Sequence, residues 1–420
     1  MSATAVPETA TETSFAPDVA GRRVARRLRP LYVALGLGGL VLWVPVEKLF
    51  MTELGFDATA VGVMAGVYAL VVPLLELPSG ILADRWSRKG VLMGAYVAML
   101  ASVLVCGVDG NVIVYVIGAG LLGVYLALQS GTLESMVYDV LQEELGEGHD
   151  FEATIGRFRA VESAALAASA IGGGLLAMAT SPRFTYFATL PLLAMSIALI
   201  SRFREPRLHQ AGERAPLREQ VATTYRTVVE RGRLRPIVTL MVLTSLLVQA
   251  MLEFGPLWML ALAAPAFLYG AQWAGLTGAL GVGGLLAARL HLDCPATLAT
   301  VGGVLVAASL AMTTSRHIAV IVPAQVALVL VLMVLSVHLT GMLHEAIPST
   351  IRAGVASGVS TLTWLVFLPF SVVFGVVTDR VGVHGAGWLV VAVATATALG
   401  LVRLVRPSTT CAPAPAAAAA

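Results

Sequence analysis

The chain has 420 residues, of which 57% are hydrophobic and only 12% are charged, and its net charge is +2. Soluble domains carry about 25% charged residues, so this composition excludes an ordinary soluble protein. The small net charge and the lack of a basic domain also exclude a nucleic-acid-binding protein. Apolar stretches of about 20 residues recur along almost the whole length, and backbone groups in lipid must hydrogen-bond internally. We therefore expect an all-α membrane protein that crosses the bilayer many times.

The chain begins with residues 1–29, a polar segment that becomes rich in arginine and that we predict to be disordered. Twelve apolar spans follow it. We predict these spans at 30–50, 58–83, 90–107, 111–137, 154–179, 183–202, 236–262, 265–289, 296–314, 317–344, 353–377 and 384–404. The tail at 407–420, which ends in alanine and proline, is of low complexity, and we predict it to be disordered.

The distribution of positive charge predicts how these spans are oriented. With twelve spans, 23 of the 27 arginine and lysine residues fall on one face of the membrane. Because cytoplasmic segments are enriched in these residues, we expect that face to be cytoplasmic and both termini to lie inside. We expect the protein to reside in the cytoplasmic membrane.

The hydrophilic segment 203–235 divides the spans into an N-terminal bundle, 30–202, and a C-terminal bundle, 236–406. The two halves echo each other, because Gly80-Ile-Leu-Ala-Asp-Arg85 ends the second span and Gly284-Leu-Leu-Ala-Ala-Arg289 ends the eighth. The repeat indicates two pseudo-symmetric six-helix bundles. In transporters built from such repeats, the substrate site lies at the interface of the repeats, near the middle of the membrane.

The most specific motif is Gly80-Ile-Leu-Ala-Asp-Arg-Trp-Ser-Arg-Lys-Gly-Val-Leu92, a charged loop between two apolar spans. It resembles the loop signature of the major facilitator superfamily and matches it except at Ser87, where the family has glycine. The resemblance implies that fold and a conformational latch, in which Asp84 pairs with Arg85 and faces the segment starting at Arg352. The residues of this latch motif are Gly80, Leu82, Asp84, Arg85, Arg88 and Lys89.

Two further stretches, 130–139 and 351–357, resemble bacterial drug exporters of the same superfamily. Proton-antiporting members of that group often carry an arginine in the fourth span and a Gly-Pro pair in the fifth. This sequence has neither.

Acidic residues inside the spans are candidates for proton coupling, since a buried charge in a membrane is costly. These candidates are Glu76, Glu134, Glu162 and Glu253. Glu76 could equally form a structural pair with a neighbouring helix, and Glu253 could lie in water at the outer end. We also expect an inner charge network around Asp84 and Arg85, which could serve only as gate ion pairs. Its members are Glu134, Asp139, Arg157, Arg159, Glu162 and Arg352.

In the superfamily, spans 1, 4, 7 and 10 line a central cavity, and this resemblance supplies candidate substrate-binding residues. They are Trp43, Gln129, Gln249, Glu253, Trp258, Gln325 and His338. His338 could instead be hydrogen-bonded packing. We expect Glu47, beside Lys48, to lie at the outer rim rather than in the site. The mostly apolar set suits a lipophilic substrate better than a sugar or a phosphate, which would call for a cavity arginine.

We therefore expect a secondary transporter, not an enzyme, that exports small lipophilic compounds such as drugs or secondary metabolites by alternating access and proton coupling. Its partners would be the small-molecule substrate, protons and the lipid bilayer. We expect a monomer without metal or cofactor. Two alternatives remain, a proton-coupled nutrient importer and a membrane sensor or scaffold that keeps the fold without transport.

Overall fold

A computed structural model describes residues 16–85, 87–108, 110–130, 132–146, 151–206, 234–287, 290, 295–347 and 352–404. Every regular element in these ranges is a helix. The first half contains α1 (Ala16–Gly38), η1 (Val44–Val46), α2 (Glu47–Glu53), α3 (Ala58–Arg85), α4 (Arg88–Val108), α5 (Val112–Gln129), α6 (Thr132–Leu145), α7 (Phe151–Ala179) and α8 (Pro182–Arg202). The second half contains α10 (Leu234–Ala261), α11 (Ala266–Ala287), α12 (Pro295–Thr314), α13 (Ile318–Ala346) and α14 (Arg352–Leu404).

These helices make the twelve predicted crossings of the membrane, although four of the crossings do not each correspond to one separate helix. The first consists of α1, η1 and α2, and the fourth of α5 and α6. The helix α14 holds the last two crossings, because its backbone turns at Gly382, where φ is 76°. The all-α fold with twelve crossings is thus confirmed within the described residues. By length and composition alone, nine helices among them qualify as membrane-spanning.

The first crossing differs from the continuous helix predicted at 30–50. It unwinds after Gly38, and a single 3-10 turn at Val44–Val46 leads into α2. The unwound backbone packs against α7, where a Cβ on Gly173 would collide with the Leu42 carbonyl oxygen. Discontinuous crossings of this kind commonly surround transporter binding sites.

The start of α1 also differs from the prediction of disorder up to residue 29. From Ala16 onward this segment is helical, and Val24, Leu28 and Leu31 form a buried stripe along one side. Arg27 on another side donates to Glu144 at 2.7 Å and to Glu143 at 3.1 Å, both on α6. Packing and ion pairs therefore extend the helix beyond the apolar run.

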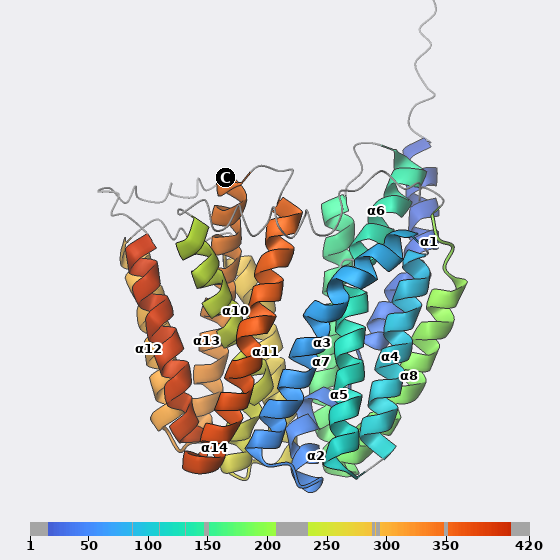
Figure 1. Ribbon diagram of the computed structural model, residues 1–420. Helices are drawn as coiled ribbons and strands as arrows, with labels where there is room; N and C mark the ends of the chain where they lie inside the picture. Colours follow the sequence, from blue (N-terminus) through green and yellow to red (C-terminus); the bar gives the residue numbers. More distant parts are fainter. Residues whose placement is uncertain are drawn as a thin grey trace, which may run out of the picture.

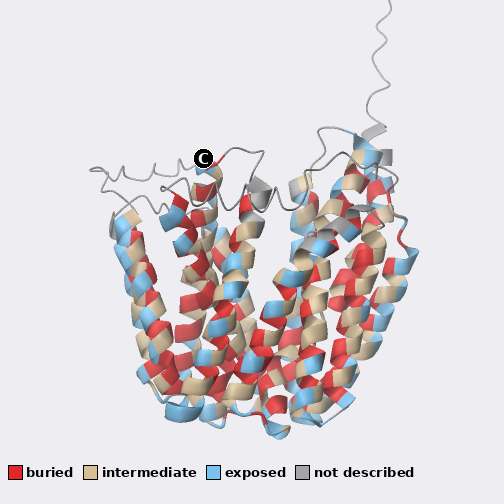
Figure 2. Ribbon diagram, viewed as in Figure 1, coloured by how far each residue is buried: buried red, intermediate tan, exposed pale blue. Residues whose placement is uncertain are grey.

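The helices of each half form one bundle, and the two bundles lean together at one end and separate at the other (Figure 1). The start of α1 and the end of α14 lie on the side where the bundles separate. Buried residues line the facing sides of the helices (Figure 2). We call the end where the bundles meet the closed end, and the opposite end the open end.

Two helix pairs make most of the contact between the bundles, α3 with α14 and α7 with α11, and smaller contacts join α2 with α10 and η1 with α11. Glycine permits both contacts, because a Cβ at Gly62 would strike the Ser371 carbonyl oxygen and a Cβ at Gly270 would strike that of Ala170. Such small-residue contacts let membrane helices approach closely.

Candidate functional site

A cavity of about 330 Å³ lies between the bundles, lined by parts of both. Most of its wall is apolar or aromatic. The aromatic lining residues are Trp43, Tyr68, Tyr96, Tyr125 and Trp273. The charged lining residues are Glu47, Lys48, Glu162 and Glu253, so the wall holds three acids and one base.

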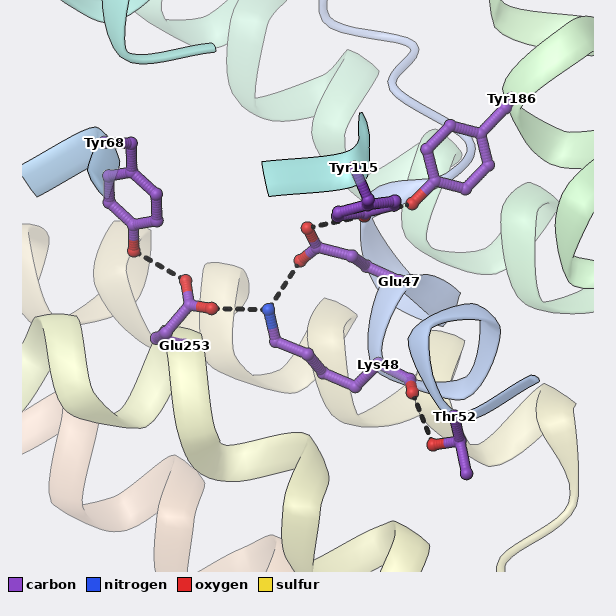
Figure 3. Close-up of polar contacts among 7 residues, drawn as sticks. All are labelled: Glu47, Lys48, Thr52, Tyr68, Tyr115, Tyr186 and Glu253. Atoms are coloured by element: carbon purple, nitrogen blue, oxygen red, sulfur yellow. Dashed lines mark hydrogen bonds and ion pairs between the residues drawn. The ribbon is translucent and has the colours of Figure 1, made fainter. Parts of the chain in front are cut away.

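An ion triplet of Glu47, Lys48 and Glu253 joins the two bundles at one end of this cavity (Figure 3). The Lys48 ammonium donates to Glu47 at 2.8 Å within α2, and it also donates to Glu253 on α10 of the other bundle. The Lys48 side chain is only 2% exposed, against 15% for Glu47 and 12% for Glu253. A buried ion pair between two bundles ties them together only while both partners stay charged.

Tyrosine hydroxyls supply further hydrogen bonds to both carboxylates of the triplet. Tyr68 donates to Glu253 at 2.6 Å, and Tyr115 donates to Glu47 at 3.0 Å. Tyr115 and Tyr186 hydroxyls lie 2.7 Å apart, which extends the chain of hydrogen bonds. With two ionised carboxylates and one ammonium, the triplet has one negative charge in excess, and one bound proton would neutralise it.

The broken first crossing explains how Lys48 reaches the bundle interface. Because the helix unwinds after Gly38 and restarts at Glu47, Glu47 and Lys48 occupy the first turn of the short helix α2. Both side chains line the cavity there, and that of Lys48 is almost fully buried.

A second pocket, of about 300 Å³, lies on the closed-end side of Lys48. Lys48 lines both pockets, while the second is otherwise walled by residues near the bundle contacts, including Met51, Val61, Leu257 and Val383. The Lys48 side chain and its partners are thus part of the barrier between the cavity and the closed end.

Four of the predicted substrate residues line the cavity: Trp43, Gln129, Gln249 and Glu253. Gln249 and Glu253 are one helical turn apart on α10, which places both on the cavity side. Glu253 is largely buried and ion-paired, so the alternative that it lies free in water does not hold.

Three other predicted substrate residues do not line the cavity, which corrects the prediction: Trp258, Gln325 and His338. Trp258 follows Glu253 by five residues, about 140° around the helix, and it packs in the interior against Phe374. Gln325 accepts a hydrogen bond from Gln272 at 2.6 Å and donates to the Gly255 carbonyl at 3.1 Å, so its amide is used within the second bundle. His338 is half-buried on α13.

The prediction that Glu47, beside Lys48, lies at the outer rim is wrong, because both residues line the cavity. Tyr68 and Trp273, from the second and eighth crossings, also line it and were not predicted. One signal was available for Lys48, because it is one of only two lysines and lies beside an acid within an apolar run. No sequence pattern identifies its partner 205 residues away.

The predicted inner charge network falls into two separate groups among the described side chains. Arg159 pairs with Glu134 at 2.5 Å and with Glu162 at 3.1 Å, and its own side chain is 61% exposed. Arg88 pairs with Asp139 at 2.5 Å and lies in a more buried setting. Arg157 lies close enough to Tyr32 to act on it electrostatically. The side chains of Asp84, Arg85 and Arg352 lie outside the described residues.

Glu76 lies on α3, next to the junction of α5 and α6, and does not line the cavity. Ser130 donates to one of its oxygens at 3.4 Å, and the other is buried without a hydrogen-bond partner. This environment offers Glu76 no cation among the described side chains, in contrast to the structural pair considered from sequence.

Part of the predicted latch motif can be followed in the structure. The helix α3 ends at Arg85 and α4 begins at Arg88, whose guanidinium also donates to the Ser135 carbonyl at 3.0 Å. Lys89 donates to the Ser201 carbonyl at 2.6 Å, and Leu82 is exposed. Gly80 has no described environment. The two motif cations Arg88 and Lys89 thus contact their own bundle, while the predicted contact of Asp84 with the start of α14 remains a prediction.

A family model described as "Major Facilitator Superfamily" matches residues 30–364 of the chain. Among curated proteins, "Probable nitrate transporter NarT" of Staphylococcus haemolyticus (strain JCSC1435) is 22% identical over 111 residues, 26% of this chain and 29% of that protein. The same-named protein of Staphylococcus aureus (strain Newman) is 21% identical over 111 residues, 26% of this chain and 28% of that protein. The chain therefore aligns with less than a third of the length of these relatives.

Solved structures share the fold over almost the whole chain. The nucleoside transporter NupG has a TM-score of 0.75 at 11% identity, covering 92% of this chain and 100% of that chain. A D-xylose-proton symporter has a TM-score of 0.65 at 15% identity, covering 90% and 98%. An inward-facing, unoccupied bacterial homologue of the lysosomal transporter Spinster has a TM-score of 0.67 at 13% identity, covering 92% and 93%.

Proposed function

Because the chain belongs to the major facilitator superfamily and is a multi-pass membrane transporter, we propose that it exports small lipophilic compounds by proton-coupled alternating access. The observation that carries this proposal is the buried ion triplet Glu47, Lys48 and Glu253, which joins the two bundles beside an aromatic cavity.

Alternating access is supported by the arrangement of the two bundles. They meet at one end and separate at the other, and the arginine-rich start of α1 lies at the open end (Figure 1). On the rule that arginine and lysine favour the cytoplasmic side, we assign the open end to the cytoplasm. The molecule would then be in its inward-open state.

Proton coupling is supported by the charge balance of the triplet. A proton on Glu253 would remove the charge that holds Lys48 to the second bundle, while Lys48 would keep Glu47 as a partner. The tie between α2 and α10 would weaken, and the closed end could then separate. In this mechanism the proton acts as a switch between the two states rather than as a reactant.

The lining of the cavity supports a lipophilic substrate, and a positive charge on it would be favourable. Aromatic faces bind flat apolar groups and attract cations, and the acids of the wall outnumber its single base. Nitrate, the substrate in the name of the curated relatives, finds weaker support. Among the described residues of the wall, Lys48 is the only cation, and two carboxylates already surround it.

Everted membrane vesicles energised with a proton gradient would test the proposal, with ethidium as the probe. We expect gradient-dependent ethidium uptake by the wild type and a loss of at least about tenfold in Glu253→Gln. Glu53→Gln, at the end of α2, is the control that should leave uptake unchanged. Unchanged uptake in Glu253→Gln would remove this residue from coupling.

Import by proton symport is the second candidate function. It draws support from the structural neighbour named as a D-xylose-proton symporter, although that likeness concerns the fold. Right-side-out vesicles distinguish the two directions, because an importer would accumulate its substrate there when protons flow inward.

A further inference from the structure

A second set of polar contacts joins the bundles at the closed end, away from the ion triplet. The Asp379 carboxylate, on α14 of the second bundle, accepts hydrogen bonds from the first residues of α3. The backbone N–H groups of Ala58 and Thr59 donate at 2.9 and 2.8 Å, and the Thr59 hydroxyl donates at 2.5 Å.

These bonds place a negative charge on the start of a helix. The first N–H groups of a helix have no partner inside it and carry a partial positive charge, which a carboxylate stabilises. Asp57 supplies the usual cap from within the chain, since it accepts from the Ala60 N–H at 2.7 Å. Asp379 adds a second cap from the opposite bundle, and this cap exists only while the two bundles touch.

Glycine brings the two helices close enough for that contact. Gly375 lies one turn before Asp379, and a Cβ on it would collide with the Ala58 carbonyl oxygen. Gly375 and Asp379 therefore both act on the start of α3. Gly375 permits the close approach of α14 to α3, and Asp379 caps the N-terminus of α3.

The sequence around Asp379 repeats the first half of the latch motif. Gly375-Val-Val-Thr-Asp-Arg380 has the same glycine, aspartate and arginine spacing as Gly80-Ile-Leu-Ala-Asp-Arg85. Asp84 lies 26 residues after the start of α3, and Asp379 lies 27 residues after the start of α14. With twelve crossings, α3 and the first part of α14 run in opposite directions. Each aspartate thus lies near the C-terminal end of its own crossing, on the side of the membrane where the other helix begins.

We propose that Asp379 and Gly375 form an outer latch, which holds the closed end shut and releases when the cavity opens to that side. It would be the counterpart, on the same two helices, of the latch that the resemblance assigns to Asp84. The proposal rests on the proposed alternating-access mechanism, and Asp379 acts as a positioning residue that touches no substrate.

The pocket on the closed-end side of Lys48 provides a way to detect release. Val61 lines this pocket and is only 3% exposed, while Thr52 lines it and is exposed. A cysteine at position 61 should react slowly with a membrane-impermeant maleimide when the closed end is shut. The reaction should become faster when that end opens.

The experiment uses the full chain with Cys106, Cys294 and Cys411 replaced and Val61→Cys as the reporter, labelled in right-side-out vesicles. We expect Asp379→Asn and Asp379→Ala to raise the labelling rate at least about fivefold, and Thr59→Val to raise it less, because the two N–H donors remain. Arg380→Gln is the neighbouring control and should leave the rate unchanged. Labelling of Thr52→Cys in each background reports whether the variant is folded and inserted.

An Asp379→Asn rate equal to that of the parent would overturn the outer latch, as would an equal increase in Arg380→Gln. If the aspartate variants fail to insert, the comparison of Thr59→Val with the parent decides instead. The labelling requires neither substrate nor proton gradient. A latch that responds as expected in a protein without ethidium transport would therefore refute the proposed function alone, and normal transport with unchanged labelling would refute the latch alone.

Discussion

At the residue scale, the ion triplet predicts unequal costs for removing its members. Replacing Lys48 by alanine leaves two buried carboxylates without a cation, whereas Glu253→Gln leaves Glu47 and Lys48 as a matched pair. Breaking a buried ion pair from one side costs about 3–5 kcal/mol. We expect Lys48→Ala to approach that loss in the free energy of unfolding and Glu253→Gln to lose clearly less.

Thermal unfolding of the purified variants in one detergent measures this difference, with Glu53→Gln as a control for a charge change on α2. A further variant combines Lys48→Ala with Glu253→Gln, and it should regain part of the lost stability because it removes one of the two unpaired charges. Equal losses in the two single variants would contradict a shared ammonium.

The pKa of the Asp379 carboxyl predicts how the closed end responds to acid. Partial burial raises the pKa of this carboxyl, but the hydrogen bonds from Thr59 and Ala58 outweigh it and hold the pKa below its ordinary value, which is about 3.9. A lowered pKa means that the contact contributes fully above the ordinary value and is lost as the pH falls through the lowered one. We expect the outer contact to be insensitive to pH from about 8 to 5 and to weaken below about 4.

Energy transfer between dyes on Glu53→Cys and Val381→Cys, one on each bundle near the closed end, follows this opening. Asp379→Asn should show a raised open fraction at every pH in that range. Asp57 and Arg380 are the nearby charged groups in the sequence, and Asp57→Asn is the control for titration of the other carboxyl. Opening that begins near neutral pH would point to a group other than Asp379.

At the scale of the elements, hydropathy and charge predicted the crossings well, because both depend on residues that are close together in the sequence. The helix α3 was predicted at 58–83 and runs over Ala58–Arg85. The break in the first crossing could not be predicted in this way, since the leucine and valine residues around Gly38 and Gly39 keep the hydropathy of the segment high. The partners that stabilise the break, such as Gly173 beside Leu42, come from another crossing.

The helix pair α7 and α11 provides a matched test of a glycine contact. In Gly270→Ala the new Cβ would meet the Ala170 carbonyl oxygen, whereas in Gly278→Ala on the same helix it would meet no atom within 4 Å. We expect Gly270→Ala to destabilise the protein by about 1–3 kcal/mol, as overpacking does. Gly278→Ala should be neutral or stabilising by up to about 1 kcal/mol, because alanine favours helix. Thermal unfolding in detergent compares the two, and equal effects would show that α7 and α11 do not need this close approach.

At the scale of the whole molecule, the resemblance predicted the family and its two-bundle fold. The family match confirms the first, and the fold shared with solved transporters confirms the second. The family resemblance did not predict where the contacts between the bundles lie. The sequence directed attention to the Asp84 end of α3, whereas the described contacts between bundles cluster at the opposite end, at Asp379 and Lys48. Contacts between residues more than 200 positions apart depend on how the two bundles tilt. The repeated motif at Gly375–Arg380 therefore does not by itself reveal that Asp379 reaches the start of α3.

A chemical tie across the closed end would test whether the bundles must separate there during transport. Thr59 and Asp379 side chains touch across the interface, so Thr59→Cys combined with Asp379→Cys should accept a short thiol-specific cross-linker. We expect the cross-link to hold the molecule open on the α1 side only and to abolish ethidium transport. The single-cysteine variants, treated with the same reagent, control for loss of the contact itself. A cleavable linker should restore the activity of the double variant when it is cut. If the linked protein transports as fast as the cleaved one, the closed end does not open in the cycle, and a rocking movement of the two bundles cannot be the mechanism.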